Sequence, residues 1–220
     1  MSGKTEVIYG RRPVEEAERG RRAVRRIWRA PDTPATELER RCGSPDHQGV
    51  VAEVDPYPYA DPGALLAADD ALVVVLDQIQ DPQNLGAICR SAEVAGAAGV
   101  VIPDRRAAGI TPAACKASAG AVEHLAVARV RNLADWLAAA KERGAWIYGA
   151  SSAAERAYTE VDWKGRAVLV MGSEGEGLRP RVAGSCDELV AIPQLGRVAS
   201  LNAAAAAAAI LFEAVRQRRG

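Results

Sequence analysis

From Leu72 onward, short runs of apolar residues, many of them β-branched, alternate with stretches of helical pattern. The runs predicted as strands are LVVVL, GVVIP, HLAVARV, AWIYGA, AVLVM and ELVAIP. Helices are expected over NLGAICRSAEVAGA, after Thr111-Pro112, over NLADWLAAAKERG, and through the alanine run Ala203 to Ala209. Strands this apolar need cover on both faces, so the pattern favours an α/β fold built around a parallel sheet.

The first part of the chain has a different, mixed pattern. It predicts a short helix near RPVEEAERGRRAVRRIWRA (residues 12–30), a second around ATELERRCG, and an extended piece at GVVAEV. The segment DPYPYADPGA follows, where neither a continuous helix nor a central strand can form. We therefore expect a small unit over residues 1–60, a linker over 61–70 and a larger domain over 71–220.

Composition excludes several classes of protein. Lys and Arg number 28, as do Asp and Glu, which argues against a uniformly basic nucleic-acid binder. Six arginines still lie between Arg19 and Arg29 without an acid among them, and they form either an RNA-binding face or a solvated helix face. The four cysteines include no C-x-x-C pair, so reduced buried thiols are favoured over a zinc site and no metal is expected. Without a membrane-length apolar run or a signal peptide, we expect a cytoplasmic protein.

The stretch MGSEGEGLRP, residues 171–180, follows the strand AVLVM as a ligand loop would. It lacks the lysine of a P-loop, and no G-x-G-x-x-G follows the first strand of the larger domain, which makes a nicotinamide-dependent dehydrogenase a poor candidate. Glu174 and Glu176 would repel a phosphate, so the loop suits a ligand that is neutral or positive where it makes contact. The alternative is a tight turn with solvated glutamates.

Three segments then occur together: DPQNLGAICRSAEVAG, VMGSEGEGLRP and AIPQLGRVASLNAAAAAAAI. Their combination over residues 70–220 resembles the SpoU (TrmH-like) family of RNA ribose 2′-O-methyltransferases. The N-terminal VIYGRRPVEEA and HQGVVAEV resemble the small ribosomal-protein-like RNA-binding domain of the bacterial 23S rRNA guanosine subgroup. The matching positions are Asn84, Gly86, Ala87 and Arg90 in the first segment, Gly172 to Gly177 in the second, and Ile192, Pro193, Ser200, Leu201 and Asn202 in the third.

The resemblance implies an architecture and a cofactor. The fold class is α/β, a parallel-sheet SPOUT methyltransferase domain with a deep trefoil knot, which general folding rules would not predict, preceded by a small α/β RNA-binding domain. The cofactor is S-adenosylmethionine, and the partners are structured RNA and a second copy of the chain in a homodimer whose active site is shared.

The resemblance also assigns roles to residues. Arg90 is expected either to act as a base toward the ribose hydroxyl or to grip a phosphate as a cation, because a guanidinium normally stays protonated. A surface pair with Glu93 is the alternative for Arg90, and capping of the last helix is the alternative for Ser200 and Asn202. The polar shell around the ribose consists of Asn84, Glu174, Ser200 and Asn202.

Cofactor binding is expected to rely mainly on backbone groups. The leading positions are Gly172, Ile192 and Leu201, with Met171, Gly177 and Ala150 at neighbouring strand ends. Arg11, Arg12 and Arg179 are the expected RNA contacts.

The expected function is methyl transfer from S-adenosylmethionine to the ribose 2′-hydroxyl of a guanosine in 23S rRNA. Two alternatives stay open: methylation of a tRNA guanosine, and a catalytically idle RNA-binding protein of the same fold.

Overall fold

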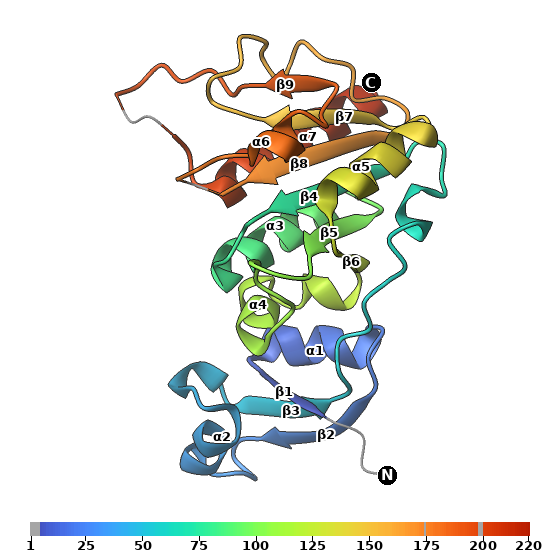
Figure 1. Cartoon of the computed structure of the whole chain (residues 1–220). Coiled ribbons are helices and arrows are strands. Elements are labelled where there is room, and N and C mark those ends of the chain that lie inside the picture. Colours follow the sequence, from blue (N-terminus) through green and yellow to red (C-terminus); the bar gives the residue numbers. More distant parts are fainter. Residues whose placement is uncertain (1–4, 174, 198–199) are drawn as a thin grey trace.

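The computed structural model describes residues 5–173, 175–197 and 200–220. Figure 1 shows a small sheet at one end of the molecule and a larger sheet in the rest of it. A three-stranded antiparallel sheet of order β1-β3-β2 belongs to the N-terminal part. A six-stranded sheet of order β6-β5-β4-β8-β7-β9 forms the larger part, and each pair of neighbours in it is parallel. The α/β class predicted from the apolar runs is confirmed.

The N-terminal unit differs from its prediction in one element. Its elements are β1 (Glu6–Tyr9), α1 (Arg11–Arg19), β2 (Val24–Arg29), α2 (Ala35–Cys42), the short 3-10 helix η1 (Pro45–His47) and β3 (Val50–Val54). The helix predicted near residues 12–30 is wrong beyond Arg19, because the second half of that stretch is strand β2, paired with β3. A bulge between Val24 and Arg26 places Val24 and Ile27 three residues apart against the core, which mimics a helical period. The arginines of this stretch therefore share no helix face.

The larger sheet follows the sequence prediction closely. Its strands are β4 (Leu72–Asp77), β5 (Gly99–Pro103), β6 (Val127–Val130), β7 (Trp146–Ala150), β8 (Ala167–Gly172) and β9 (Glu188–Val190). The strand expected over HLAVARV begins only at Val127, and the one expected over ELVAIP ends at Val190.

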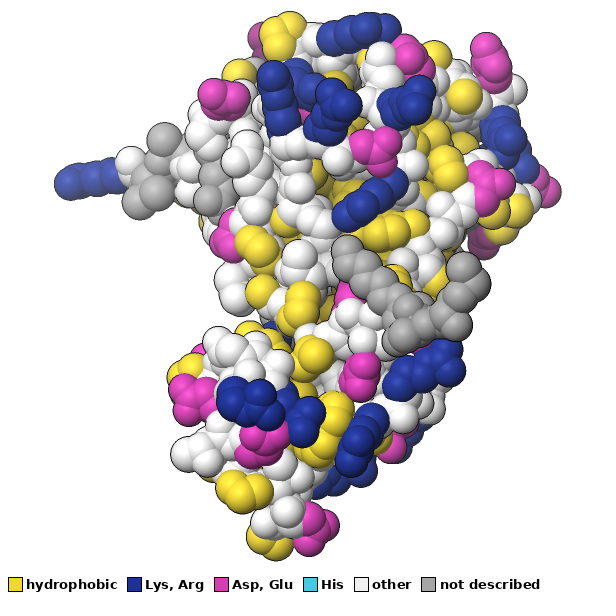
Figure 2. Space-filling model, turned by 60° about the horizontal axis from the view of Figure 1, so that its bottom comes forward, with side chains coloured by type: hydrophobic (Ala, Val, Ile, Leu, Met, Phe, Trp, Pro, Cys, Tyr) yellow, Lys and Arg dark blue, Asp and Glu magenta, His cyan; other side chains and the backbone are white. Residues whose placement is uncertain are grey.

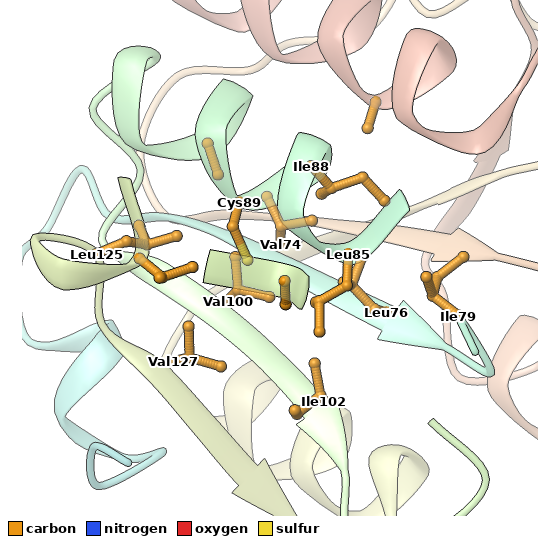
Figure 3. Close-up of a cluster of buried hydrophobic side chains, with 14 of the residues drawn as sticks. Val74, Leu76, Ile79, Leu85, Ile88, Cys89, Val100, Ile102, Leu125 and Val127 are labelled. Carbon is orange, nitrogen blue, oxygen red and sulfur yellow. The ribbon is translucent and has the colours of Figure 1, made fainter. Parts of the chain in front are cut away.

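Helices cover both faces of this sheet. On one face lie α3 (Pro82–Val94), α4 (Pro112–Ala117) and α7 (Ala203–Arg219), and on the other lie α5 (Leu133–Glu142) and α6 (Pro180–Ala183), with the 3-10 helices η2 (Ala64–Leu66) and η3 (Ala121–Glu123) in connections. Strand geometry explains this, because alternate residues point to opposite faces: Val74 packs with the α3 side and Val75 with the α5 side. Figure 3 shows Leu85 and Ile88 of α3 above the β4 and β5 side chains.

The C-terminal alanine run forms the predicted helix and packs against the sheet and a neighbouring helix. Helix α7 contacts α3 and β8, and its buried residues follow the helical spacing. They are Ala203, Ala207, Ile210, Leu211 and Ala214. None of the helices in the described ranges has the length and apolar character that a bilayer crossing requires. The trefoil knot stays a prediction, since the segment leading into α7 includes residues 198 and 199.

The N-terminal unit joins the larger part through a buried ion pair. Arg22 is 5% exposed and donates from Nε to Glu123 Oε2 at 3.0 Å, while its Nη2 also binds Glu123 Oε1. Glu123, in η3 of the larger part, is fully buried. Gly20 permits this approach, because a Cβ there would lie 2.6 Å from the Cβ of Glu123. Figure 1 shows α1 between the small sheet and the rest of the molecule.

The proline-rich connection is packed rather than extended away from the protein. Tyr57 is buried, and its hydroxyl donates to the carbonyl oxygen of Leu125 at 2.8 Å. The Tyr59 hydroxyl accepts a hydrogen bond from the backbone N–H of Ile110 at 2.9 Å. Leu65 and Leu66, within the predicted linker, are buried as well. The division into residues 1–60, 61–70 and 71–220 stays a prediction, and one hydrophobic cluster extends across it.

We predict that Glu123→Gln lowers the free energy of unfolding by about 3–5 kcal/mol, because it leaves the buried guanidinium of Arg22 without its main counter-charge. Urea denaturation followed by circular dichroism measures this change. Asp55→Asn is the control, since it removes the carboxylate of the exposed Arg25–Asp55 pair and should leave the unfolding midpoint almost unchanged. Equal shifts in the two variants would contradict the role of the buried pair.

Candidate active site

A cavity of about 330 Å³ lies where the carboxyl ends of β7, β8 and β9 meet the start of α7. All six residues expected to bind the cofactor line it: Ala150, Met171, Gly172, Gly177, Ile192 and Leu201. They come from three segments separated in sequence, and the parallel sheet gathers them because its strands end at one edge. No Lys or Arg occurs in the described lining, and Glu176 contributes a carboxylate to it.

The glycines of MGSEGEGLRP shape the wall of this cavity. Ser173 and Gly177 exchange two backbone hydrogen bonds, of 3.2 and 3.0 Å, which close a narrow turn. A Cβ at Gly172 would lie 2.2 Å from the carbonyl carbon of Gly177, and Gly177 itself has a φ of +67°. Glycine is therefore needed at both positions, for close backbone approach at Gly172 and for positive φ at Gly177.

A buried carboxylate holds the segment that follows this turn. Asp77 ends β4, pairs in register with Gly172, and is fully buried. Its Oδ2 accepts the backbone N–H of Arg179 at 2.8 Å, and its Oδ1 accepts Nε–H of Arg179 at 2.7 Å. Asp77 is not among the site residues predicted from the sequence, although an aspartate that ends a wholly apolar run was the available signal. Arg179, expected to contact RNA, thus uses part of its guanidinium within the protein.

Two of the expected polar-shell residues contact one another. Asn202 donates from Nδ2 to Oδ1 of Asn84 at 2.9 Å, which links the first turn of α3 to the third motif. Asn202 Oδ1 also accepts from the backbone N–H of Ala204 at 2.9 Å, so Asn202 caps α7. Ser200 is exposed and lines the cavity. Glu174, the remaining member, lies outside the described residues.

Arg90 stands apart from the cavity. It is exposed on α3 and does not line the pocket. Within the described residues it forms no ion pair, so the surface pair with Glu93 is absent there. Within one chain, Arg90 therefore lies outside the cavity that is lined by the residues expected to bind the cofactor.

The two N-terminal arginines expected to contact RNA lie at the start of α1. Arg11 donates from Nε to the carbonyl oxygen of Gln48 at 3.3 Å. Arg12 Nη1 lies 3.7 Å from Glu15 Oε2 in an exposed ion pair. Both side chains border a shallow surface hollow. Figure 2 shows Lys and Arg on both parts of the molecule, interspersed with acidic side chains rather than gathered into one uniform face.

The cysteines divide into two kinds. Burial raises the pKa of the Cys89 and Cys115 thiols to about 12, as expected for inert core residues. Cys42 and Cys186 are only half-buried, so the expectation of buried thiols is wrong for these two. Across residues 5–173, 175–197 and 200–220, no three His, Cys, Asp or Glu side chains gather as a metal site would require.

The sequence pattern of the SpoU rRNA Methylase family matches residues 71–212. The chain belongs to this family. It is therefore an RNA methyltransferase that uses S-adenosylmethionine, as its three motifs predicted.

Individual SpoU relatives match nearly the whole chain. A TrmH family tRNA/rRNA methyltransferase of Bacillus subtilis, YacO, is 37% identical over 99% of this chain and 98% of its own length. The SpoU methyltransferase AviRb of Streptomyces viridochromogenes, solved with AdoMet, has a TM-score of 0.83 at 28% identity and covers 97% of this chain and 90% of its own.

Two further solved structures differ in how much of the chain they match. An AdoMet-bound rRNA methyltransferase of Sinorhizobium meliloti has a TM-score of 0.80 at 26% identity, over 96% of this chain and 87% of its own. A TrmH/SpoU tRNA modifying enzyme of A. aeolicus has a TM-score of 0.63 at 28% identity, over 72% of this chain and 80% of its own.

The residues of the cavity fit S-adenosylmethionine. Its volume of about 330 Å³ lies in the range of small-molecule sites, and Leu178 and Ile210 offer apolar walls to an adenine ring. Gly172 and Gly177 have no side chains, so they contribute only backbone atoms to the lining, which suits polar recognition of the ligand. The described lining includes Glu176 and no basic residue, which suits a cofactor that carries a positive sulfonium.

We predict that Gly172→Ala weakens S-adenosylmethionine binding at least about tenfold, equivalent to about 1.4 kcal/mol, because its Cβ would push the Gly177 backbone away and open the turn. Isothermal titration calorimetry measures the dissociation constant. Gly196→Ala is the control, since Gly196 is not among the residues that line the cavity and a Cβ there meets no atom within 4 Å. Equal affinities of the two variants would refute the role given to Gly172.

Proposed function

We propose that this SpoU methyltransferase acts on the ribose 2′-hydroxyl of a guanosine in 23S rRNA. The observation that supports this most is the N-terminal unit, residues 6–54 of the structure, which packs on the catalytic part through the buried pair of Arg22 and Glu123. The structural match to the rRNA methyltransferase of S. meliloti extends over 96% of the chain, whereas the match to the tRNA modifying enzyme of A. aeolicus extends over 72%. A cytoplasmic site of action belongs to the same proposal, since the RNA substrate is made there.

The role proposed for S-adenosylmethionine is to supply an electrophilic methyl group. Backbone groups of Gly172, Ile192 and Leu201 hold it in the cavity, with Met171, Gly177 and Ala150 beside them. The turn closed by Ser173 and Gly177 fixes this wall before the cofactor arrives, so that little ordering is needed on binding.

The polar residues hold the RNA ribose beside that cavity. The bond from Asn202 to Asn84 ties the start of α3 to the start of α7, so Ser200, two residues earlier, is kept at the mouth of the pocket. Capping of α7 by Asn202 and a part in the site are therefore compatible. Glu174 keeps its proposed place in this shell. Arg11, Arg12 and Arg179 are the proposed contacts to RNA phosphates.

The proposed homodimer accounts for the position of Arg90. Arg90 and Val94 are four residues apart on α3 and share one face, and Val94 is 61% exposed. Helix α7 packs beside α3 and exposes Phe212 by 48%. A second chain covering these apolar side chains would bring Arg90 to the boundary between two active sites. Sedimentation equilibrium of the wild-type protein measures whether two chains associate.

Arg90→Ala is expected to lower the rate of methyl transfer about 10²–10⁴-fold while S-adenosylmethionine binds normally, because Arg90 activates or orients the ribose hydroxyl and lies outside the cofactor pocket. Single-turnover transfer of a labelled methyl group measures the rate, and calorimetry measures cofactor binding. Glu93→Ala, one turn along the same helix, should retain full activity. Full activity of Arg90→Ala would remove Arg90 from the mechanism. Recovery of the rate by Arg90→Lys with an unchanged pH–rate profile would favour the phosphate-gripping cation, whereas recovery with a profile shifted toward the lower pKa of lysine would favour the base.

The substrate is tested by incubating the enzyme and labelled S-adenosylmethionine separately with unmodified 23S rRNA and unmodified tRNA. We expect ribose methylation at a guanosine of 23S rRNA alone, mapped by resistance of the modified position to alkaline cleavage. Incorporation into tRNA alone would overturn the proposal in favour of the tRNA alternative. Bound cofactor without transfer to either RNA would favour the idle RNA-binding protein.

A further inference from the structure

A second cavity, of about 370 Å³, lies at the same edge of the large sheet, and five of its lining residues are arginines. They are Arg105, Arg106, Arg131, Arg179 and Arg181. We call it the arginine pocket. No acidic residue and no aromatic ring occurs in its described lining.

The topology of the sheet explains why the arginines meet. Arg105 and Arg106 follow the end of β5, and Arg131 follows the end of β6. Arg179 and Arg181 belong to the start of α6, in the connection after β8. Because these strands are parallel, their carboxyl ends share one edge, and the residues that follow them converge there.

The arginine pocket has excess positive charge. Asp77 accepts a hydrogen bond from Nε–H of Arg179. Arg181 Nη2 lies 2.9 Å from Asp135 Oδ1 in an exposed ion pair. Arg105, Arg106 and Arg131 are exposed and form no ion pair with the described residues. Five guanidinium groups therefore face two carboxylates in a concave site, where like charges raise the local potential for an anion.

The arginine pocket shares a wall with the cofactor cavity. Leu178 and Ala183 line the cofactor cavity, whereas Arg179, Arg181 and Val182, in the same short segment, line the arginine pocket. Asp77 fixes that segment through the backbone and guanidinium of Arg179. An RNA strand whose ribose reaches the cofactor cavity can thus extend across α6 to the arginines.

We propose that the arginine pocket binds a backbone phosphate of the RNA strand that carries the target ribose. Guanidinium groups match the oxygens of a phosphodiester with paired N–H donors, and a site without an aromatic ring has no platform for stacking a base. The pocket thus positions the strand independently of its sequence. This inference rests on the proposed RNA methylation and adds Arg105, Arg106, Arg131 and Arg181 to its substrate contacts.

The test compares Arg105→Ala/Arg131→Ala with Arg143→Ala/Lys164→Ala, which removes the same charge. The control residues lie at the opposite edge of the sheet, because Arg143 follows α5 shortly before β7 begins and Lys164 lies shortly before β8 begins. Binding of an unmodified 23S rRNA fragment is followed by fluorescence anisotropy over a range of KCl concentrations. Calorimetric titration with S-adenosylmethionine shows whether each variant still binds the cofactor and therefore remains folded around that cavity.

We expect the pocket variant to bind RNA about tenfold more weakly at 0.1 M KCl, with the slope of log affinity against log salt reduced by about one, and to bind the cofactor normally. The control should keep the wild-type slope. Equal slopes of the two variants would overturn the inference, and so would inorganic phosphate that binds the wild-type pocket while RNA affinity is unchanged in the variant. If the wild type binds rRNA without methylating it, the proposed function fails, whereas the salt slopes still decide the arginine pocket.

Discussion

The buried carboxylate of Asp77 is the interaction on which both sites of this enzyme depend. Burial of a charge costs several kcal/mol unless hydrogen bonds compensate for it, and here Arg179 supplies a backbone N–H and a guanidinium N–H. Asp77 also stands beside Gly172 in the β4–β8 register. The connection from Gly172 to Arg179 is therefore held at both ends. One side of it faces the cofactor cavity and the other faces the arginine pocket.

The two sites have opposite electrostatics, which suits the two substrates of an RNA methyltransferase. The cofactor cavity contains Glu176 and no basic residue in its described lining, whereas the arginine pocket contains five arginines. Under the proposed function, the cofactor cavity favours the positively charged sulfonium, and the arginine pocket, on the other side of α6, favours the negatively charged RNA strand. The segment between the two cavities is only the short stretch from Leu178 to Ala183, so an RNA strand needs to cross only this stretch to reach both of them.

The N-terminal unit is joined to the catalytic part by specific buried contacts. Arg22 enters between Glu123 and Glu6, and Tyr57 reaches the carbonyl oxygen of Leu125. Glu123 is fully buried, so water does not compete for its bonds to Arg22, and the N-terminal unit holds a fixed position relative to the sheet. A fixed second unit can position a large folded RNA, which agrees with the proposed preference for rRNA.

The sequence by itself determined the elements whose pattern is local. Runs such as LVVVL are apolar at every position, which predicts a strand buried on both faces, and the three motifs predicted the family. The residues that those motifs propose for the cofactor line one cavity. Strand β2 was missed because Val24, Ile27 and Trp28 have helical spacing, and only pairing with β3 across a bulge makes them a strand.

Tertiary structure alone decided which charged residues act together. Arg22 belongs to an arginine-rich run expected to be solvated or to bind RNA, yet its partner Glu123 is distant in sequence and buries it. The arginine pocket likewise draws on three connections, of which the sequence pointed only to the one with Arg179, and they meet only because parallel strands end at one edge. Hydrophobic period is a property of neighbouring residues, whereas the pairing of charges depends on which distant segments the fold brings together.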